Sequence, residues 1–317
     1  MQRPFRFGVI CEEMGTGEQW SAKARRVEEL GYTTLLLRDH FLPGPFGDQF
    51  APLSALMAAA MVTSKLHVGS MVLDNDYRHP VVLAKEVATL DVLSGGRFEF
   101  GLGAGWMSSE YEQAGLRFDR PGVRIDRFEE ALQVFKGLFA DGPLTFAGKH
   151  YTITDISGFP KPLQRPHPPI LVGAGGRRML AIAAREADIV GILAGPLNAG
   201  VLVNDPAAYS AESFGQKIAL LRETAGERFA HLELSTTTAP VFTNNRTLGA
   251  EQVAQNRGWS GVSAEEILAM PTIFVGTVEQ VAEQMLERRE RFGISYYMTT
   301  DGSMEEYAPI VERLAGK

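Results

Sequence analysis

The sequence contains very little cysteine and no long uninterrupted apolar run. Cys11 is the one cysteine among 317 residues, so no disulfide can form within the chain. It lies in an apolar segment, which predicts a small buried side chain and a reducing compartment. No apolar stretch approaches the ~18 residues that cross a bilayer. Segment 1–6 lacks the apolar core of a signal peptide. We therefore expect a cytoplasmic protein without a membrane partner.

Positive charge is scarce relative to negative charge. Lys and Arg together number 31, against 38 Asp and Glu, and the net charge is -7. Nucleic acids and anionic membrane surfaces bind basic faces of proteins. We therefore expect neither as a partner, and a small molecule as the ligand.

The signatures of two common catalytic sites are absent from the sequence. The six histidines show no metal-ligand spacing, and there is no His-Glu-x-x-His segment, so we expect no metal site. No Gly-x-Ser-x-Gly segment is present for a serine nucleophile. These absences leave a metallohydrolase and a serine hydrolase without support.

Strand and helix patterns alternate along most of the chain. Short apolar runs typical of strands buried on both faces are separated by amphipathic segments typical of helices. The expected strands are 5–12, 33–40, 66–73, 97–102, 169–172, 188–193, 232–243 and 294–300. Eight parallel strands can close into a barrel that side chains fill. We predict one (β/α)8 barrel domain over residues 1–317, with a doubly wound parallel sheet as the alternative.

Two segments do not follow the repeat. Residues 141–169 are rich in proline and contain two alternating runs, which predicts a hairpin and an extended connector. Residues 243–270 are polar, with short helical pieces at 250–255 and 264–270. Long insertions at the mouth of a barrel are commonly lids or substrate-facing loops. We therefore predict that the second segment faces the substrate.

The second expected strand ends abruptly in Asp39 and His40. Ligands bind at the carboxyl ends of parallel strands, and buried strands seldom end in titratable groups without a cleft beside them. His40 is accordingly a candidate catalyst. The alternative, that it is a structural hydrogen-bonding residue at the strand end, stays open on the residues alone.

Two glycine-rich strand ends indicate ligand contacts. In segment 173–178, glycines lead into a helix that begins with Arg177 and Arg178, a pattern that favours phosphate binding by amides and guanidinium groups. The alternative is a tight turn with solvated arginines. Segment 101–106 is a poor dinucleotide fingerprint, because Trp106 stands where glycine or alanine is needed. It can instead let a flat ring lie against backbone, or be a plain turn with a core tryptophan.

Taken together, these segments resemble the luciferase-like monooxygenase superfamily, and within it the actinobacterial oxidoreductases that use the deazaflavin coenzyme F420. The resemblance covers essentially the whole chain and is specific for the superfamily, but it separates F420 from FMN only moderately. It is carried by segments 39–41, 73–80, 90–97, 101–106 and 172–178. It implies a luciferase-like (β/α)8 barrel with insertions at its carboxyl-terminal mouth, and a homodimer. It also implies a non-proline cis peptide at the end of the third strand, at Met71–Val72 or else at Ser70–Met71.

The resemblance also implies roles for individual residues. His40 would donate or accept the proton that accompanies hydride transfer. Asp39 is the second catalytic residue that the resemblance implies; it would contact the reactive part of the cofactor and act through placement and charge. The remaining cofactor-binding positions that it implies are Met71, Val72, Asn75, Gly103, Gly105, Trp106, Gly175, Gly176, Arg177 and Arg178.

Two departures from the sugar-phosphate dehydrogenases of this group argue for a more apolar substrate. Those enzymes carry a glutamate where this chain has Trp106, and a lysine that is missing from segment 193–196. We predict an F420-dependent oxidoreductase that transfers hydride to or from a small organic substrate. The alternatives are an FMN-dependent monooxygenase and a non-catalytic flavin-binding homologue. The sequence does not identify the substrate, although Phe46, Trp106 and segment 243–270 are expected to select it.

Overall fold

Eight parallel strands close into a barrel, which confirms the predicted fold class. Neighbouring strands follow the order β3-β2-β1-β15-β12-β9-β8-β5, and β5 pairs back with β3 to close the ring. The short strand β4 (Leu73–Asp74) continues beyond β3 and also pairs with β5. The barrel strands are β1 (Arg6–Ile10), β2 (Thr34–Leu37), β3 (His67–Ser70), β5 (Phe98–Gly103), β8 (Ile170–Ala174), β9 (Ile189–Ile192), β12 (Glu233–Thr237) and β15 (Ile294–Thr300).

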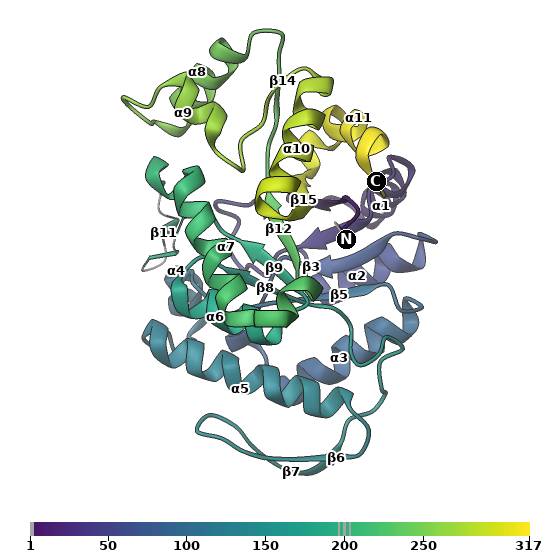
Figure 1. Cartoon of the computed structure of the whole chain (residues 1–317). Coiled ribbons are helices and arrows are strands. Elements are labelled where there is room, and N and C mark those ends of the chain that lie inside the picture. The colour runs from purple at the N-terminus through teal and green to yellow at the C-terminus, as the bar shows by residue number, and fades with distance from the viewer. Residues whose placement is uncertain (1–2, 196, 199–200, 203) are drawn as a thin grey trace.

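Helices surround the barrel (Figure 1). The structure is a computed structural model that describes residues 3–195, 197–198, 201–202 and 204–317. Met1 and Gln2, which belong to the segment 1–6 that was predicted not to be a signal peptide, therefore lie outside the described residues. The helices are α1 (Gly17–Glu29), α2 (Pro52–Met61), α3 (Pro80–Leu93), α4 (Ser108–Ala114), α5 (Pro121–Phe139), α6 (Arg177–Glu186), α7 (Ala211–Ala225), α8 (Arg246–Arg257), α9 (Ala264–Ala269), α10 (Val278–Phe292) and α11 (Met304–Leu314). Short 3-10 turns are η1 (Asn75–Tyr77), η2 (Pro206–Tyr209), η3 (Gly226–His231) and η4 (Asp301–Ser303).

The barrel strands are buried on both faces, as their apolar runs predict. All four residues of β2 and all six of β5 are buried. Inside the barrel, an apolar cluster lies beneath the mouth and consists of Ile10, Leu36, Leu171, Ile189, Tyr296 and Met298. The larger core fills the space between the barrel and its helices. The side chains below the mouth therefore form a packed floor for any cavity above them.

The prediction for the seventh strand was too long. Strand β12 ends at Thr237, whereas the sequence predicted a strand to residue 243. Pro240 has no N–H to donate to a sheet ladder, so the strand cannot continue through it. The chain then forms β13 (Val241–Phe242), which pairs with β14 (Val275–Gly276) outside the barrel.

The two segments that do not follow the strand–helix repeat form different structures at opposite ends of the molecule. Within residues 141–169, the strands β6 (Pro143–Ala147) and β7 (Thr152–Ser157) form an antiparallel hairpin beside α5. Within residues 243–270, α8 and α9 pack on each other around a small apolar cluster of their own. Figure 1 shows these two helices at the end of the molecule opposite the hairpin. Strands β10 (Leu197–Asn198) and β11 (Val201–Leu202) form a further short pair.

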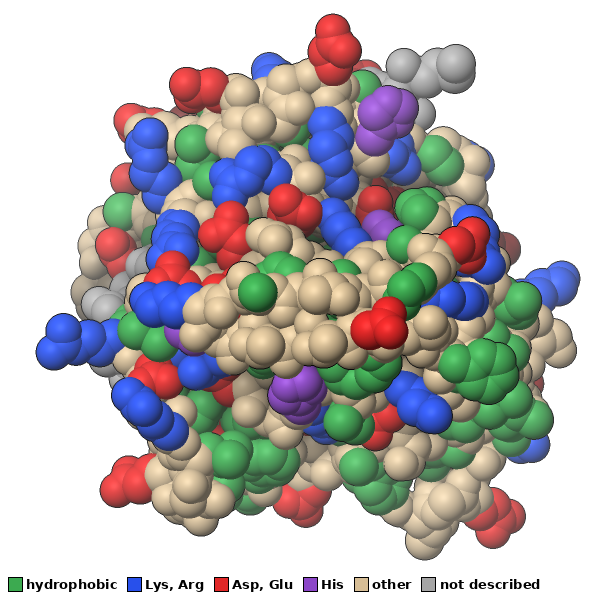
Figure 2. Space-filling view, turned by 90° about the horizontal axis from the view of Figure 1, so that it is seen from below, with side chains coloured by type: hydrophobic (Ala, Val, Ile, Leu, Met, Phe, Trp, Pro, Cys, Tyr) green, Lys and Arg blue, Asp and Glu red, His purple; other side chains and the backbone are tan. Residues whose placement is uncertain are grey.

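Charges of both signs are interspersed on the surface. Figure 2, a view from below, shows Lys and Arg side chains mixed with Asp and Glu, without one large basic patch on this face. None of the helices in the described part of the chain has the length and apolarity that a bilayer crossing requires.

Candidate active site

A cavity of about 650 Å³ opens at the carboxyl ends of the barrel strands. Because all eight strands are parallel, the residues that follow them meet at this one end of the barrel. Part of its wall comes from Phe46 and from the strand ends, at Arg38–His40, Met71–Asp74, Gly103–Trp106, Gly173 with Gly175–Gly176, Leu193–Gly195 and Thr236–Ala239. The structure therefore gathers most of the sequence-predicted site residues around one cavity.

His40 lies in the cavity wall and is held by a carboxylate. Its Nδ1 atom is 2.9 Å from Oε2 of Glu110. The imidazole stacks on Phe46, with ring centroids 5.1 Å apart, and meets Trp106 edge-on at 6.0 Å. Among the described residues, Nε2 has no hydrogen-bond partner. The ring is therefore fixed on one side and available to a ligand on the other.

Glu110 on α4 is a site residue that sequence reasoning missed. It is buried, and besides His40 it accepts hydrogen bonds from the amides of Phe41 and Leu42 and from the Tyr77 hydroxyl. Burial opposes ionisation of this carboxyl, but the hydrogen bonds from His40, Leu42 and Tyr77 outweigh it and lower its pKa. The sequence signal that could have identified Glu110 is its position next to Tyr111, on a short helix that follows a glycine-rich strand end.

Asp39 also lines the cavity, but its carboxylate is occupied by the protein. Both guanidinium NH groups of Arg78 bond to it, with Nη2 at 3.1 Å from Oδ1, and the amide of Asp74 donates to Oδ2 at 3.1 Å. The side chain is 4% exposed. Asp39 therefore joins the end of β2 to the end of β4 and orients the loop that carries His40.

The wall beside the strand end that carries His40 is formed by the ends of β3 and β5, largely from backbone, glycine and the side chains of Met71 and Val72. The Met71–Val72 peptide is cis, as the resemblance implied, and both side chains line the cavity. A Cβ atom on Gly103 would lie 2.6 Å from Cγ2 of Val72, so any other residue there would displace the Val72 side chain. Gly105 has φ of +72°, and its Cβ atom would lie 2.0 Å from the Tyr111 hydroxyl. The glycines of β5 and its loop therefore keep this wall thin.

Gly175 and Gly176 line the cavity, whereas Arg177 and Arg178 do not. Gly176 is the N-cap of α6 and makes no side-chain capping bond, so the first amides of the helix are open to an anion. The Arg178 guanidinium bonds to Asp126 and to the carbonyl of Gly122 on α5. Arg177 is exposed. Neither arginine side chain therefore lies in the cavity lining, and their contact with a ligand phosphate stays a prediction.

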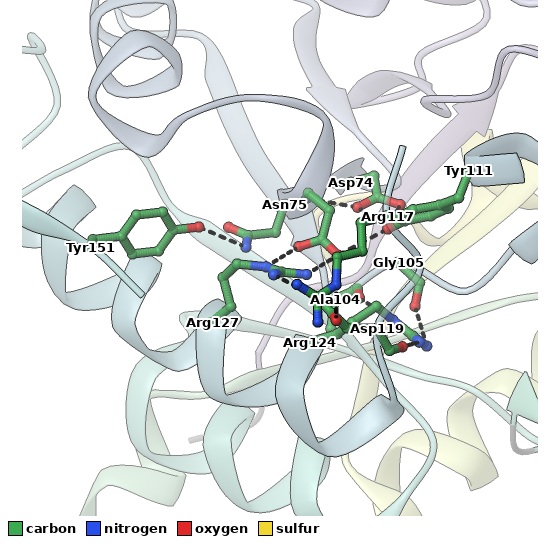
Figure 3. Close-up of polar contacts among 11 residues, drawn as sticks. Asp74, Asn75, Ala104, Gly105, Tyr111, Arg117, Asp119, Arg124, Arg127 and Tyr151 are labelled. Carbon is green, nitrogen blue, oxygen red and sulfur yellow. Dashed lines mark hydrogen bonds and ion pairs between the residues drawn. The ribbon is translucent and has the colours of Figure 1, made fainter. Parts of the chain in front are cut away.

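Asn75 also lies apart from the other predicted ligand residues. It is buried and does not line the cavity. Its side-chain amide donates to the Tyr151 hydroxyl at 3.4 Å (Figure 3). The side chain therefore links η1 to the segment that joins β6 and β7, because the turn after β4 directs it away from the mouth.

The outer part of the cavity is formed by the 243–270 insertion and its neighbours. Val253, Asn256 and Arg257 of α8 line it, together with Tyr209, Val241 and Ile273. Trp106 and Phe46 line the cavity beside His40. No residue of the 141–169 segment lines the cavity. Within the predicted segment 193–196, Leu193, Ala194 and Gly195 line the wall, and Pro196 lies outside the described residues.

Comparisons with known proteins identify relatives of two kinds. The profile of the family described as luciferase-like monooxygenase matches residues 12–246. An FMNH2-dependent dimethylsulfone monooxygenase of Pseudomonas putida is 29% identical over 187 residues, which cover 57% of this chain and 51% of that protein. An F420-dependent glucose-6-phosphate dehydrogenase of Microbacterium testaceum is 32% identical over 193 residues, which cover 59% of this chain and 56% of that protein. The chain spans about half the length of these curated relatives.

A solved structure extends the likeness over the whole fold. An F420-dependent secondary alcohol dehydrogenase in complex with an F420–acetone adduct matches with a TM-score of 0.73 and 17% identity, covering 98% of each chain. At this identity the match concerns the fold alone. The family profile spans more than half of the sequence and includes His40, Glu110 and the glycine-rich strand ends, so the chain belongs to the luciferase-like monooxygenase family.

Proposed function

We propose that the protein is an F420-dependent oxidoreductase that transfers hydride between the deazaflavin and a small organic substrate. One observation carries this proposal: His40, held by Glu110, presents its second ring nitrogen to a cavity walled by glycine backbone and by Met71 and Val72. Such a wall accommodates a flat ring, and an imidazole beside it can move the proton that accompanies hydride transfer.

The donor groups around the cavity fit a ring that carries a phosphate. Met71, Val72 and the thin wall at Gly103 and Gly105 would hold the ring. The uncapped start of α6 would hold the phosphate, since a Cβ atom on Gly176 would meet nothing within 4 Å and its backbone is accessible. The cavity is not filled by side chains, which supports an enzyme over a non-catalytic flavin-binding homologue.

The hydrogen bond to Glu110 determines which ring nitrogen of His40 can exchange a proton with a ligand in the cavity. A bound deazaflavin would supply or take the hydride. Because the lowered pKa of Glu110 keeps it an acceptor, Nδ1 of His40 must be the donor in their bond. Nε2 is then the atom that accepts or returns a proton on the cavity side. Asp39 contributes by orienting this loop through Arg78.

The cavity composition supports a substrate that is largely apolar. The outer part carries Tyr209, Val241, Val253 and Ile273, and Trp106 lies beside His40. Asn256 and Arg257 are the polar side chains that α8 contributes there. We propose that this outer part of the cavity selects the substrate.

We also propose that the protein acts as a homodimer, as its resemblance to the family implies.

Cofactor titration tests the proposal directly. The purified protein should bind F420 with micromolar or tighter affinity and bind FMN more weakly, as followed by cofactor fluorescence. Deazaflavin has carbon at the position where flavin has a reactive nitrogen, so hydride transfer without use of dioxygen is expected. Micromolar FMN binding without F420 binding would overturn the first choice of cofactor.

An FMN-dependent monooxygenase is the second candidate. The specific observation in its favour is the dimethylsulfone monooxygenase relative, whose identity is close to that of the F420-dependent relative. Under this reading the same walls hold the flavin. Consumption of dioxygen with reduced FMN, measured with an oxygen electrode, separates it from the F420-dependent reaction.

Gly176→Asp should weaken binding of a phosphate-bearing cofactor by about 10-fold or more. The new carboxylate would cap α6 and place negative charge where the phosphate is proposed to lie. The phosphate would then lose its favourable interaction with the helix dipole, which is worth about 1 kcal/mol, and would be repelled by the carboxylate. The residue has extended backbone and no atom near its Cβ position, so the fold should tolerate the change. Fluorescence titration with the cofactor, and with its phosphate-free ring portion, measures the effect.

Matched variants separate charge from capping. Gly176→Ser caps the helix without charge and should change affinity much less than Gly176→Asp. Arg178→Ala should change it less than about threefold, because its guanidinium is already paired with Asp126. Equal losses with and without the phosphate, or a large loss in Arg178→Ala, would place the phosphate elsewhere.

A further inference from the structure

A group of three carboxylates and two arginines lies at the cavity wall, and two of the carboxylates, Asp39 and Asp74, line the cavity. Asp39 is paired with Arg78, and Asp76 is paired with Arg127 through two bonds of 2.7 and 2.8 Å. Asp74 has no ion-pair partner among the described residues. It is 7% exposed and lines the cavity. One buried carboxyl is therefore left without a cation, which is costly for a charged group.

The hydrogen bonds of Tyr111 give a second, independent indication. Its hydroxyl lies 2.9 and 2.8 Å from the two oxygens of Asp74 and 3.2 Å from Oδ2 of Asp76 (Figure 3 labels Asp74 and Tyr111). A hydroxyl has one hydrogen and can donate to one of these oxygens at a time. A proton on Asp74 resolves the arrangement, since Asp74 can donate to Tyr111 while Tyr111 donates to Asp76.

Tyr111 itself keeps its hydrogen. Burial, followed by the nearby charges of Asp74 and Asp76, raises the pKa of its hydroxyl well above the usual range. The chain of donors therefore runs from Asp74 through Tyr111 and ends on Asp76, which also accepts from the Arg127 guanidinium. One oxygen of Asp74 also accepts from the Asp76 amide at 2.8 Å, but the contacts of Tyr111 with Asp74 and with Asp76 can both be hydrogen bonds at the same time only when Asp74 carries a proton.

We propose that Asp74 is a neutral carboxylic acid that holds a proton in the cavity wall. Loss of this proton weakens the binding of a ligand whose electron-rich ring edge lies beside Asp74. The glycine at position 105 lets the wall come close, since a Cβ atom there would lie 2.7 Å from Oδ2 of Asp74. The ligand half of this proposal rests on the proposed function, whereas the protonation half does not.

The surroundings of Asp74 contain few compensating charges. Its own segment contributes Asp76, Tyr77 and Arg78, the end of β2 contributes Asp39 and His40, α4 contributes Glu110 and Tyr111, and α5 contributes Arg124 and Arg127. The Arg124 guanidinium donates to the carbonyls of Ala104, Gly105 and Asp119 and does not reach a carboxylate (Figure 3). Negative neighbours therefore balance the cations around this carboxyl.

Burial, together with the nearby charges of Asp76 and Asp39, raises the pKa of Asp74 from 3.8 to about 7. In the folded protein the proton is then held up to about pH 7, while the unfolded chain loses it near pH 3.8. Folding takes up a proton between these values, so Asp74 lowers stability as the pH rises through that window, and the deficit persists above it.

Asp74→Asn tests the protonation half without any cofactor. Asparagine mimics the neutral acid and cannot ionise. Relative to Asp74→Asn, the melting temperature of the wild-type protein should fall by roughly 2–4 °C for each pH unit between about pH 5 and about pH 7. Asp119→Asn is the matched control, because Asp119 pairs with Arg127 and Arg117 in the same network but does not line the cavity. It should follow the wild-type curve in this window.

Infrared spectroscopy of the wild-type protein supplies a second measurement that needs no Asp74 variant to fold. A protonated carboxyl band should be present near pH 6 and disappear by about pH 8.5. Its absence near pH 6, or identical stability curves for wild type and Asp74→Asn, would overturn the proposal.

Cofactor affinity tests the ligand half. The dissociation constant of wild type should rise at least 10-fold between about pH 6.5 and about pH 8.5, and that of Asp74→Asn by less than threefold after the same cofactor titration. If neither F420 nor FMN binds at any pH, the proposed function fails while the stability result stands. If binding occurs and both proteins show the same pH dependence, the role of Asp74 toward the ligand is refuted.

Discussion

Replacing His40 by Ala should lower turnover by ~10²–10⁴, the usual range for loss of a general acid–base group. Nε2 of His40 has no hydrogen-bond partner among the described residues and lies on the cavity wall, so the variant removes the group that we propose holds the proton there. Cofactor affinity should change much less, because the proposed phosphate site at Gly176 is on another strand end. Steady-state kinetics and cofactor titration on the same preparation measure both quantities.

Asp39→Asn is the comparison for this experiment. Asp39 pairs with Arg78 and accepts from the Asp74 amide, so the variant should act through the position of the loop and cost less turnover than His40→Ala. Suppose instead that His40→Ala lowered the melting temperature and the cofactor affinity together, with near-normal turnover in the folded fraction. His40 would then be a structural residue at the end of β2.

Replacing Glu110 by Gln should lower turnover by roughly 10²-fold, because the carboxylate that selects the His40 tautomer is lost. Stability should also change with pH. The folded-state pKa of Glu110 lies below its unfolded value of 4.5, so its carboxylate stabilises the fold above that value. This contribution is lost as the pH falls through the folded-state pKa. In Glu110→Gln, the free energy of unfolding should therefore fall less steeply at acid pH than in the wild-type protein.

Tyr77→Phe separates positioning from packing. The Tyr77 hydroxyl donates to the same oxygen of Glu110 at 2.9 Å, so this variant loosens the carboxylate without removing its charge. It should keep most of the turnover and leave the pH profile of kcat in place, whereas Glu110→Gln should shift that profile. Nitrogen NMR of His40 should report a changed tautomer population in Glu110→Gln alone. Equal effects of the two variants on all readouts would make Glu110 a purely structural residue.

Much of the fold could be predicted from the sequence because its signals are local. Runs such as Thr34–Leu37 and Ile170–Ala174 are buried on both faces, and their apolar composition is visible without any partner. Glycine-rich strand ends were predicted to contact a ligand, and Gly103, Gly105 and Gly175 do line the cavity. Counting such runs was enough to predict eight strands and a closed barrel.

Polar partnerships could not be predicted in the same way. His40 and Glu110 are 70 residues apart in sequence, and the bond between them exists because β2 and the loop after β5 end at the same mouth. Arg178 was predicted to contact phosphate, but it meets Asp126 because α5 packs beside α6. The pairing of β13 with β14 likewise exists only in the folded chain, although Pro240 already marks in the sequence a point that β12 cannot pass.

The sequence by itself therefore determined the barrel, the strand ends that face its mouth and the small residues that keep the mouth open. These features depend on apolar burial and backbone freedom, which each segment carries in its own composition. Only the tertiary structure decided which side chains share protons and charges, among them His40 with Glu110 and Asp74 with Tyr111. The physical reason is that a hydrogen bond or ion pair depends on distances of a few ångströms between groups that chain closure alone brings together.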